Sequence, residues 1–164
     1  MSKIKNIQDK VLNQDLLKAR LNIWRLLEKK IVFTNGCFDL VHAGHIDYLA
    51  KAADLGDKLI IGLNSDQSTR NIKGSGRPIT DEYSRSLVLA SFSFVDAVVL
   101  FDAETPLQLI KMVNPDILVK GADYTIDQIV GSDFVIQNGG SVQTLEYLPG
   151  YSTSLIEKKI RSLK

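Results

Sequence analysis

Short apolar runs and longer amphipathic segments alternate along this chain. The runs typical of buried strands lie at 31–33, 58–63, 97–101, 116–120 and 141–148. The segments with apolar residues at helical spacing lie at 43–55, 81–94, 106–113, 126–138 and 152–163. Strands that alternate with helices form mostly parallel sheets covered on both faces, so the pattern predicts a three-layer, doubly wound α/β domain with a five-stranded sheet. Ligands of such sheets bind beyond the carboxyl ends of the strands.

The N-terminal segment follows a different pattern. Apolar residues, among them Leu17 and Trp24, recur there at helical spacing and end at the basic segment 28–30. We therefore expect an N-terminal helical extension, residues 1–30, followed by a single domain, residues 31–164. The apolar face of this extension needs a cover, which is either the domain's own sheet or a second subunit. A homo-oligomer, specifically a dimer, is the expected assembly.

Composition narrows the class of protein. The 164 residues hold 20 Lys and Arg against 19 Asp and Glu, and a net charge of +1 provides no basic field for nucleic acid. No apolar run approaches the roughly 18 residues of a membrane helix, and residues 1–5 lack the start of a signal peptide. We expect a cytoplasmic protein without a nucleic-acid or membrane partner. Cys37 is the only cysteine, which excludes an internal disulfide and suits a small residue packed behind a turn.

Both histidines lie in one tetrapeptide, His42-Ala43-Gly44-His45, just after the first predicted strand. Because a helical pattern begins at Ala43, the two imidazoles share one face of the first helical turn. Free backbone N–H groups and the helix dipole attract anions there, and Gly44 lets a ligand approach the backbone. The tetrapeptide therefore predicts a phosphate site. Two histidines without a clear third ligand make a poor zinc site, so we predict no metal ligand.

Other polar segments follow the predicted strands. Three successive hydroxyl residues, 152–154, open the last helix and exceed what one N-cap needs, which suits a polyphosphate. The glycine-rich loop 73–78 offers Lys73 and Arg77 to phosphate groups, unless it is an ordinary solvated loop. We expect Arg85, one turn into the next helix, to point back into the same cleft.

Two further segments end strands, and two nucleotide-binding motifs are missing. Residues 64–66 follow the second predicted strand and residues 120–124 end the fourth, where side chains face the ligand crevice.

Asp39 is either a turn residue or a partner that orients an imidazole. The sequence contains no Gly-x-x-x-x-Gly-Lys-[Ser/Thr], which excludes a P-loop kinase, and no Gly-x-Gly-x-x-Gly after the first strand.

The motifs together resemble a known enzyme family. The run Phe33-Thr34-Asn35-Gly36-Cys37-Phe38-Asp39 before His42-x-Gly-His45, with the late hydroxyl segment, resembles the Rossmann-like cytidylyltransferase-like nucleotidylyltransferases. The segments 62–66, 73–78 and 118–124, with Arg85, are similar to those of D-glycero-β-D-manno-heptose-1-phosphate adenylyltransferases. In many bacteria that activity is the C-terminal half of a protein fused to a sugar kinase. The late motif of the family usually ends in threonine, and Ser154 keeps the hydroxyl.

This resemblance implies transfer of AMP from ATP to D-glycero-β-D-manno-heptose 1-phosphate, which gives ADP-heptose and pyrophosphate for lipopolysaccharide core synthesis. The expected catalytic residues are His42, His45, Lys73 and Arg77. The expected nucleotide-binding residues are Asn35, Gly36, Phe38, His42, His45, Lys120, Gly121, Asp123, Tyr124, Ser152, Thr153 and Ser154. The expected acceptor-binding residues are Asp39, Asn64, Asp66, Lys73, Arg77 and Arg85. Mg²⁺ is expected on the substrate phosphates, held mainly through water.

The implied reaction needs little covalent help from the protein. A sugar phosphate has a second pKa of about 6, so it is already an anionic nucleophile near neutral pH. Catalysis then consists of positioning two polyanions and stabilising the transferring group. The alternatives are a cytidylyltransferase acting on glycerol 3-phosphate or ethanolamine phosphate, an FAD synthetase, a non-catalytic nucleotide-binding module and, more distantly, a flavodoxin-like redox protein.

Overall fold

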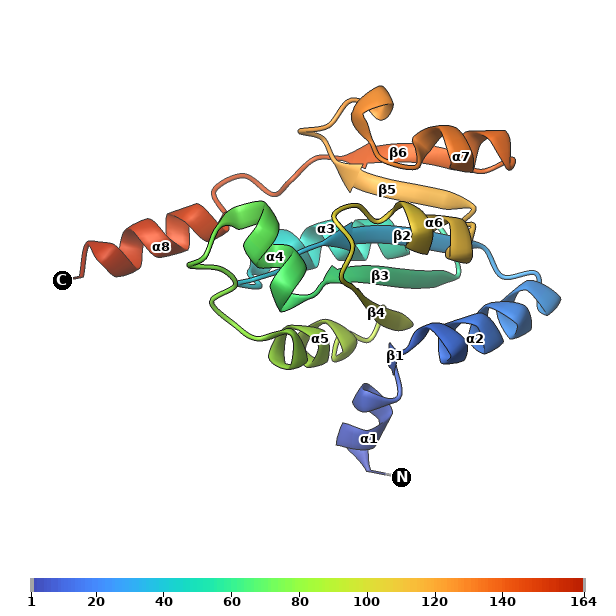
Figure 1. The fold of residues 1–164 in the computed structure, drawn as a ribbon, viewed down its shortest axis with the longest axis horizontal. Helices are drawn as coiled ribbons and strands as arrows, with labels where there is room; N and C mark the ends of the chain where they lie inside the picture. The colour runs from blue at the N-terminus through green and yellow to red at the C-terminus, as the bar shows by residue number, and fades with distance from the viewer. Residues whose placement is uncertain (1, 164) are drawn as a thin grey trace.

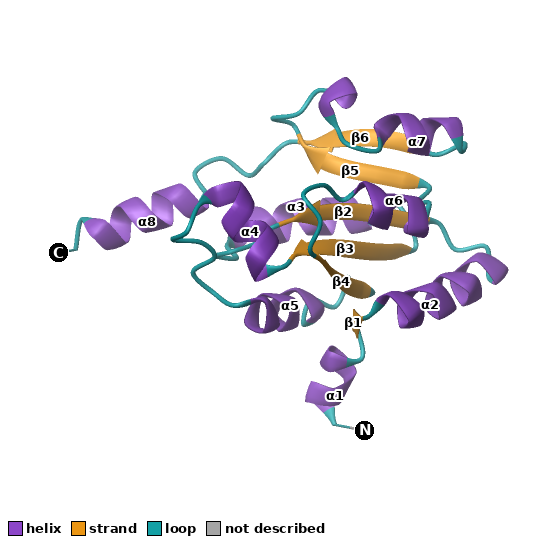
Figure 2. Ribbon diagram, in the orientation of Figure 1, coloured by secondary structure: helices purple, strands orange, loops and turns teal. Residues whose placement is uncertain are grey.

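A computed structural model describes residues 2–163, which form one parallel sheet with helices on both faces (Figures 1 and 2). The strands are β1 (Val11–Leu12), β2 (Ile31–Gly36), β3 (Lys58–Asn64), β4 (Ala97–Phe101), β5 (Ile117–Gly121) and β6 (Ser141–Leu145). The helices are α1 (Lys3–Gln8), α2 (Gln14–Leu26), α3 (Ala43–Ala53), α4 (Asp66–Lys73), α5 (Glu82–Ala90), α6 (Leu107–Val113), the 3₁₀ turn η1 (Ile126–Gln128), α7 (Ser132–Gln137) and α8 (Thr153–Arg161).

The predicted α/β architecture is confirmed, but the predicted number of strands is wrong. The described sheet has 6 strands in the order β1-β4-β3-β2-β5-β6, and each neighbouring pair is parallel. The additional strand, β1, lies within the N-terminal segment that was expected to be only helical. Its two residues, Val11 and Leu12, pair with Val98 and Val99 of β4. A strand of two residues is too short to produce an alternating pattern in the sequence.

Two helical expectations also differ from the structure. The predicted helix at 126–138 is divided into η1 and α7 because Gly131 takes a left-handed conformation with φ of 86°. Helix α4 was not predicted, because Ile72 is the only large apolar residue in an otherwise polar segment. Its polar start is anchored by Ser65, whose side chain accepts a hydrogen bond from the N–H of Ser68.

Each face of the sheet carries its own apolar core layer. Successive strand residues point to opposite faces, so Phe33 and Ile60 pack with α2, α6 and α7, whereas Val32 and Ile61 pack with α3 and α5. The buried residues of α2, which include Leu17, belong to the first layer. The apolar face of the N-terminal helix is therefore covered by the chain's own sheet.

The strand order determines where a ligand site can form. The chain passes from β2 through β3 to β4 on one side, and then crosses to β5 and β6 on the other side of β2. The reversal between β2 and β5 leaves a crevice at the carboxyl ends of these strands. The turns that lead into α3, α4, α6 and η1 all start from this end. Within residues 2–163, no helix has the length and apolar character needed to span a bilayer.

Substitution of two adjacent leucines of α2, Leu16 and Leu17, tests whether this helix unfolds together with the rest of the domain. Leu17 is 0% exposed and Leu16 is 55% exposed. We expect Leu17→Ala to lower the free energy of unfolding by about 2–5 kcal/mol, because it leaves a cavity in the core. Leu16→Ala, the matched control, should change it by less than about 0.5 kcal/mol. Urea unfolding monitored by circular dichroism measures both, and equal effects would contradict the assignment of α2 to the core.

Candidate active site

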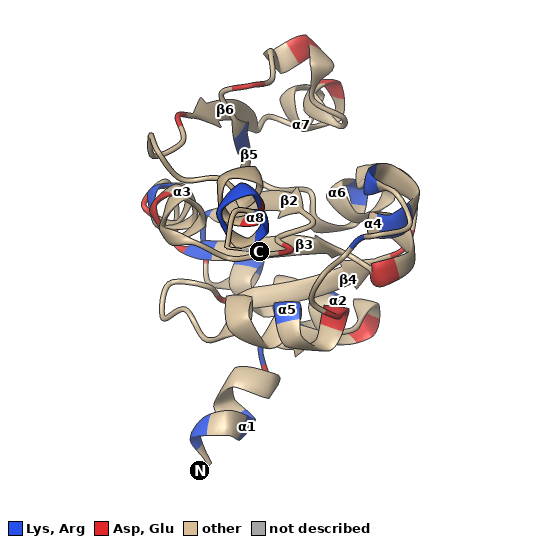
Figure 3. Cartoon of the chain, turned by 90° about the vertical axis from the view of Figure 1, so that its left-hand side faces the viewer, with Lys and Arg blue, Asp and Glu red and all other residues tan. Residues whose placement is uncertain are grey.

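A cleft of about 310 Å³ opens at the carboxyl ends of β2, β3 and β5. Figure 3 views the molecule from this end, with α8 directed toward the viewer. The cleft is lined by Asn35, Gly36, Cys37, Phe38, His45, Tyr48, Asn64, Ile72, Lys73, Glu104, Pro106, Lys120, Gly121, Asp123, Tyr124 and Tyr147. Eight of the predicted nucleotide-binding residues and two of the predicted acceptor-binding residues are in this lining. The remaining predicted residues lie around the cleft or in its supports.

The two histidines stand together at the start of α3. His42 is the N-cap residue, His45 lies in the first turn, and their ring centroids are 4.0 Å apart. The Nδ1 atoms of both rings are buried, and neither has a hydrogen-bond partner among residues 2–163. Burial lowers the pKa of His42, and burial together with the charges of His42 and Lys73 lowers the pKa of His45 to about 4. Both imidazoles are therefore neutral at pH 7.

Phe38 fixes the position of His45 in the cleft. Its backbone takes a left-handed conformation with φ of 46°, in the turn between β2 and α3. The Phe38 ring is buried and meets the His45 ring edge-on, with centroids 5.5 Å apart. This contact holds the imidazole against the helix start, so little side-chain entropy remains to be lost when a ligand binds.

The start of α8 lies beside the histidine turn. A Cβ atom added to Gly44 would come within 3.0 Å of the His42 ring and 3.1 Å of the Tyr151 Cβ. Gly44 therefore permits the close approach of the segment that opens α8. Ser152 is the N-cap of α8 and accepts a hydrogen bond from the N–H of Leu155 at 3.1 Å. The hydroxyl segment and the histidines thus lie on the same side of the sheet, next to the cleft.

Lys120 lines the cleft from β5. Its Nζ donates a hydrogen bond to the Asn35 carbonyl at 3.2 Å and lies 5.7 Å from the centre of the Tyr124 ring. Burial lowers the pKa of Lys120 to about 8, partly opposed by the carboxylate of Asp123. The ammonium group remains mostly charged at pH 7. Because burial has already removed much of its water, little further desolvation is needed when it binds an anion.

Tyr48 and Tyr147, which the sequence analysis missed, also line the cleft. A Cβ at Gly121 would overlap the Tyr147 hydroxyl, so only glycine lets this ring cover the end of β5. The Tyr48 hydroxyl is hydrogen-bonded to Thr34 Oγ1 at 2.8 Å. Burial raises the pKa of Tyr147 to about 12, so its hydroxyl keeps its proton. Tyr48 lies on the buried face of an amphipathic helix, where its pattern is that of a core residue and gives no sign of a cleft.

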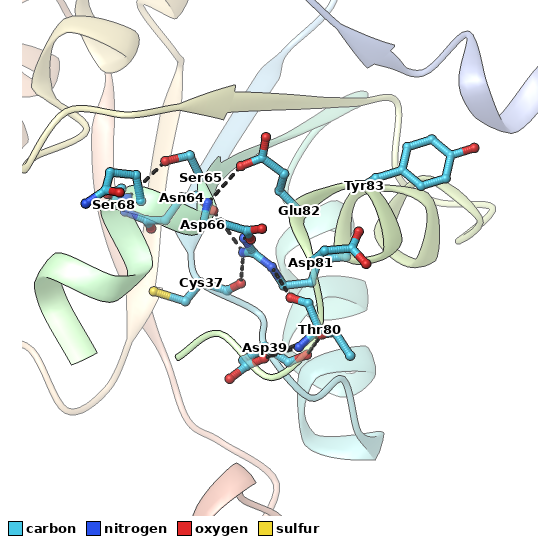
Figure 4. A network of polar contacts seen from close by, with 12 residues as sticks. Cys37, Asp39, Asn64, Ser65, Asp66, Ser68, Thr80, Asp81, Glu82 and Tyr83 are labelled. Atoms are coloured by element: carbon cyan, nitrogen blue, oxygen red, sulfur yellow. Dashed lines mark hydrogen bonds and ion pairs between the residues drawn. The ribbon is translucent and has the colours of Figure 1, made fainter. Parts of the chain in front are cut away.

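Arg85 corrects one sequence-based expectation. Its side chain is 1% exposed and does not point into the cleft. The guanidinium donates from Nε to the Thr80 carbonyl (3.0 Å), from Nη1 to the carbonyls of Cys37 (2.6 Å) and Asn64 (2.8 Å), and from Nη2 to Asp66 Oδ1 (2.7 Å). Figure 4 shows these acceptors converging from separate loops. Because these donors are used within the protein, Arg85 stabilises the backbone next to the cleft and does not contact a ligand in it. Asp66 was expected to bind the acceptor, but it pairs with Arg85.

Asp39 and Arg77 form a second supporting network. Asp39 is 4% exposed and accepts hydrogen bonds from Arg77 Nη1 (2.7 Å) and from the N–H groups of Ile79 (2.7 Å) and Thr80 (3.1 Å). Arg77 also pairs with Glu157 of α8. Burial by itself raises the pKa of Asp39, but the hydrogen bonds from Arg77 and from two backbone N–H groups outweigh it and lower the pKa. Asp39 therefore neither orients an imidazole nor faces an acceptor, and both expectations are wrong.

Asn64 and Lys73 are the predicted acceptor-binding residues that reach the cleft. Asn64 ends β3 and donates from Nδ2 to Ser68 Oγ at 2.9 Å. Lys73 ends α4, at the rim of the cleft. Glu104 also lines the cleft, and the sequence analysis missed it. It follows the end of β4, at the same edge of the sheet as Asn64 at the end of β3. Its position after a predicted strand was the signal that could have found it.

Comparison with known proteins shows which family the chain resembles. The family model described as cytidylyltransferase-like matches residues 33–159. The chain is 51% identical to the bifunctional protein HldE of Methylobacillus flagellatus over 154 residues, which are 94% of this chain and 32% of that protein. It is 57% identical to the bifunctional protein HldE of Campylobacter curvus over 134 residues, 82% of this chain and 28% of that protein. The chain thus spans about a third of the length of these relatives.

Solved structures show the same fold. A lipopolysaccharide core biosynthesis protein from Thermoplasma volcanium is 30% identical with a TM-score of 0.60, covering 73% of this chain and 97% of that chain. A pantoate-beta-alanine ligase from Francisella tularensis, complexed with beta-gamma ATP and beta-alanine, has a TM-score of 0.63 at 15% identity. It covers 92% of this chain and 76% of that chain, and the likeness shows the fold alone.

Replacement of Arg85 tests its supporting role. Lysine cannot reproduce a planar fork that serves several carbonyls, so Arg85→Lys should lower the free energy of unfolding by about 2–4 kcal/mol. Arg70→Lys is the matched control, because Arg70 is exposed on α4. Urea unfolding of both variants measures the difference. Equal stabilities would show that the Arg85 network contributes little.

The pKa of His45 predicts a pH dependence of stability. Between its ordinary value of 6.5 and about 4, the unfolded chain binds a proton at His45 that the folded chain does not. The free energy of unfolding should therefore fall as the pH falls through this window. His45→Gln removes this titration, so its loss of stability between pH 7 and pH 4 should be smaller by about 1–3 kcal/mol. Urea unfolding at a series of pH values checks this, and parallel curves for both proteins would contradict it.

Proposed function

Because this chain belongs to the cytidylyltransferase-like family, we propose that it transfers AMP from ATP to D-glycero-β-D-manno-heptose 1-phosphate. The products are ADP-heptose and pyrophosphate, for synthesis of the lipopolysaccharide core. The observation that carries the proposal is the meeting of two neutral histidines with the starts of α3 and α8 beside one cleft. About half of the aligned residues are identical to those of the bifunctional HldE relatives, which supports the choice of acceptor.

The triphosphate of ATP lies, in this proposal, along the histidine turn and the start of α8. The free N–H groups of both helices face the same region, and helix N-termini bind phosphate oxygens. Because Nδ1 is buried in both rings, Nε2 is the nitrogen left to meet a phosphate. His42, His45 and the hydroxyls at 152–154 supply the donors. A phosphate beside a neutral imidazole raises its pKa, so binding of ATP draws protons onto the pair.

The adenosine lies on the side of β5 and β6. Asn35, Gly36 and Phe38 line the cleft, together with Lys120, Gly121, Asp123 and Tyr124 at the end of β5 and just after it. The Asp123 carboxylate suits the ribose hydroxyls, since an ionised carboxylate is an acceptor only. Lys120 provides positive charge between the base side and the phosphates. This arrangement leaves the side of β3 and β4 for the acceptor.

The transfer is a single in-line displacement. An anionic oxygen of the sugar phosphate forms a bond to the α-phosphorus, and the bond to the β-phosphate breaks and releases pyrophosphate. Lys73, on the rim of the cleft, neutralises the approach of the two anions. Arg77 was expected to act beside it, but its pairing with Asp39 and Glu157 makes it a link between the loop and α8.

Magnesium fits this site only through the substrate. Within residues 2–163, no three His, Cys, Asp or Glu side chains are placed to hold a metal ion. When bound, Mg²⁺ neutralises charge on the triphosphate, and phosphate oxygens with water would be its ligands. We also propose a cytoplasmic location and a homodimer. Exposed residues of α8, among them Leu155 and Ile160, offer an apolar face that a second copy would bury.

A substrate panel tests the proposal. Pyrophosphate release should require ATP rather than CTP, and heptose 1-phosphate rather than glycerol 3-phosphate or ethanolamine phosphate. His45→Ala should lower kcat by about 10²–10³-fold, because it removes a donor to the transferring phosphates. Lys51→Ala is the control, since Lys51 lies on the exposed side of α3. Preference for CTP, or unchanged release by His45→Ala, would overturn the assignment.

A further inference from the structure

Helix α8 carries most of the hydroxyl segment but has little attachment to the domain. It extends away from the sheet, and none of its residues is buried (Figure 1). Among residues 2–163, the hydrogen bonds of the segment 152–163 all lie within that segment, and one ion pair joins it to the rest of the chain. A loosely held helix binds phosphate weakly, because binding must first order it. The position of its hydroxyl groups therefore depends on few contacts.

Apolar packing by itself does not fix the position of α8. Ile156 and Ile160 of this helix line a cavity of about 330 Å³ together with Val41, before α3, and Val88 of α5. Ile160 is 53% exposed and Val88 is 43% exposed. Side chains that border a cavity lose part of the dispersion energy that close packing provides. A directional polar contact is needed to set the orientation of the helix.

The ion pair of Glu157 supplies such a contact. Arg77 Nη2 pairs with Glu157, and the side chains of both residues are 20% exposed. The other arm of the same guanidinium, Nη1, donates to Asp39 Oδ2 at 2.7 Å, and the Asp39 side chain is 0% exposed. Asp39 belongs to the turn that leads from β2 to His42. One rigid fork of donors thus connects the histidine turn to α8.

Glu157 lies on the same face of α8 as Thr153. The two residues are four positions apart in the helix, so their side chains are neighbours on its surface. Both are partly buried, whereas Lys158 and Lys159 are exposed. The face of α8 that meets Arg77 is therefore the face that Thr153 turns toward the domain. An anchor at Glu157 consequently sets the direction of the N–H and hydroxyl groups at the start of the helix.

We propose that Glu157 is a positioning residue for triphosphate binding, because through Arg77 it holds the start of α8 beside the histidine turn. This inference rests on the proposed function, in which the hydroxyl groups at 152–154 meet the β- and γ-phosphates of ATP. The Glu157 carboxylate is not part of the cleft lining and acts only through Arg77. Its effect is therefore limited to ligands that carry β- and γ-phosphates.

Calorimetric titration with a non-hydrolysable ATP analogue and with AMP tests this role. Glu157→Ala should raise the Kd for the analogue by about 5- to 20-fold, because it removes a partly buried ion pair that orders the binding groups. Glu157→Gln keeps an acceptor without the charge and should raise it by about 2- to 5-fold. The Kd for AMP should change by less than about twofold. In steady-state kinetics, the KM for ATP should rise while that for heptose 1-phosphate stays within about twofold.

Lys159→Ala is the matched control on the same helix. Lys159 is exposed, and among residues 2–163 it takes part in none of the ion pairs. A double-mutant cycle identifies the partner, because Glu157→Ala should weaken binding of the analogue by less than about twofold further when Arg77 is already alanine. Urea unfolding of each variant checks that it is folded, and the single Glu157 variants decide the question where Arg77→Ala does not fold.

The outcomes separate this inference from the proposed function. Tight binding of the ATP analogue by the wild type, without pyrophosphate release from ATP and heptose 1-phosphate, would reject only the proposed function. Equal affinity of the wild type and Glu157→Ala for the analogue would overturn the inference. An equal loss of affinity for AMP, or full additivity with Arg77→Ala, would also overturn it, because either result would show that Glu157 does not act on the outer phosphates through Arg77.

Discussion

The buried guanidinium of Arg85 is the interaction on which the rest of the site depends. It joins the turn after β2, the end of β3 and the loop before α5 by donating to their carbonyl groups, and it pairs with Asp66 at the start of α4. These segments are far apart in sequence, and their backbone carbonyls are satisfied by one rigid fork of donors. The lower wall of the cleft is therefore set before any ligand arrives.

On this fixed support, burial rather than net charge controls the electrostatics of the cleft. The pKa of His45 falls to about 4 and that of Lys120 to about 8, in each case mainly through burial. At pH 7 the imidazole of His45 is consequently neutral, whereas the ammonium group of Lys120 stays mostly charged. A phosphate group beside a neutral imidazole would raise its pKa, so that binding of an anion and protonation would be coupled.

The order of the strands separates the two tasks of the site. The reversal between β2 and β5 places the histidine turn at the centre of this edge, with Asn64 at the end of β3 on one side and Lys120 in β5 on the other. Under the proposed function, the two phosphorylated substrates meet at this turn with their charged parts toward each other, although their mutual repulsion opposes that approach.

The sequence alone determined the parallel α/β class, the approximate positions of five strands and the paired histidines, because periodicity and turn residues are local signals. It also indicated Lys120 and Asn64, since residues at strand ends collect at one edge of such a sheet. Only the tertiary structure decided that Arg85, Asp39 and Asp66 are supports, because their partners are distant in sequence and a charged side chain looks the same whether it meets a ligand or a carbonyl. The pairing of β1 with β4 and the burial that lowers the pKa of His45 likewise depend on long-range packing, which no local pattern encodes.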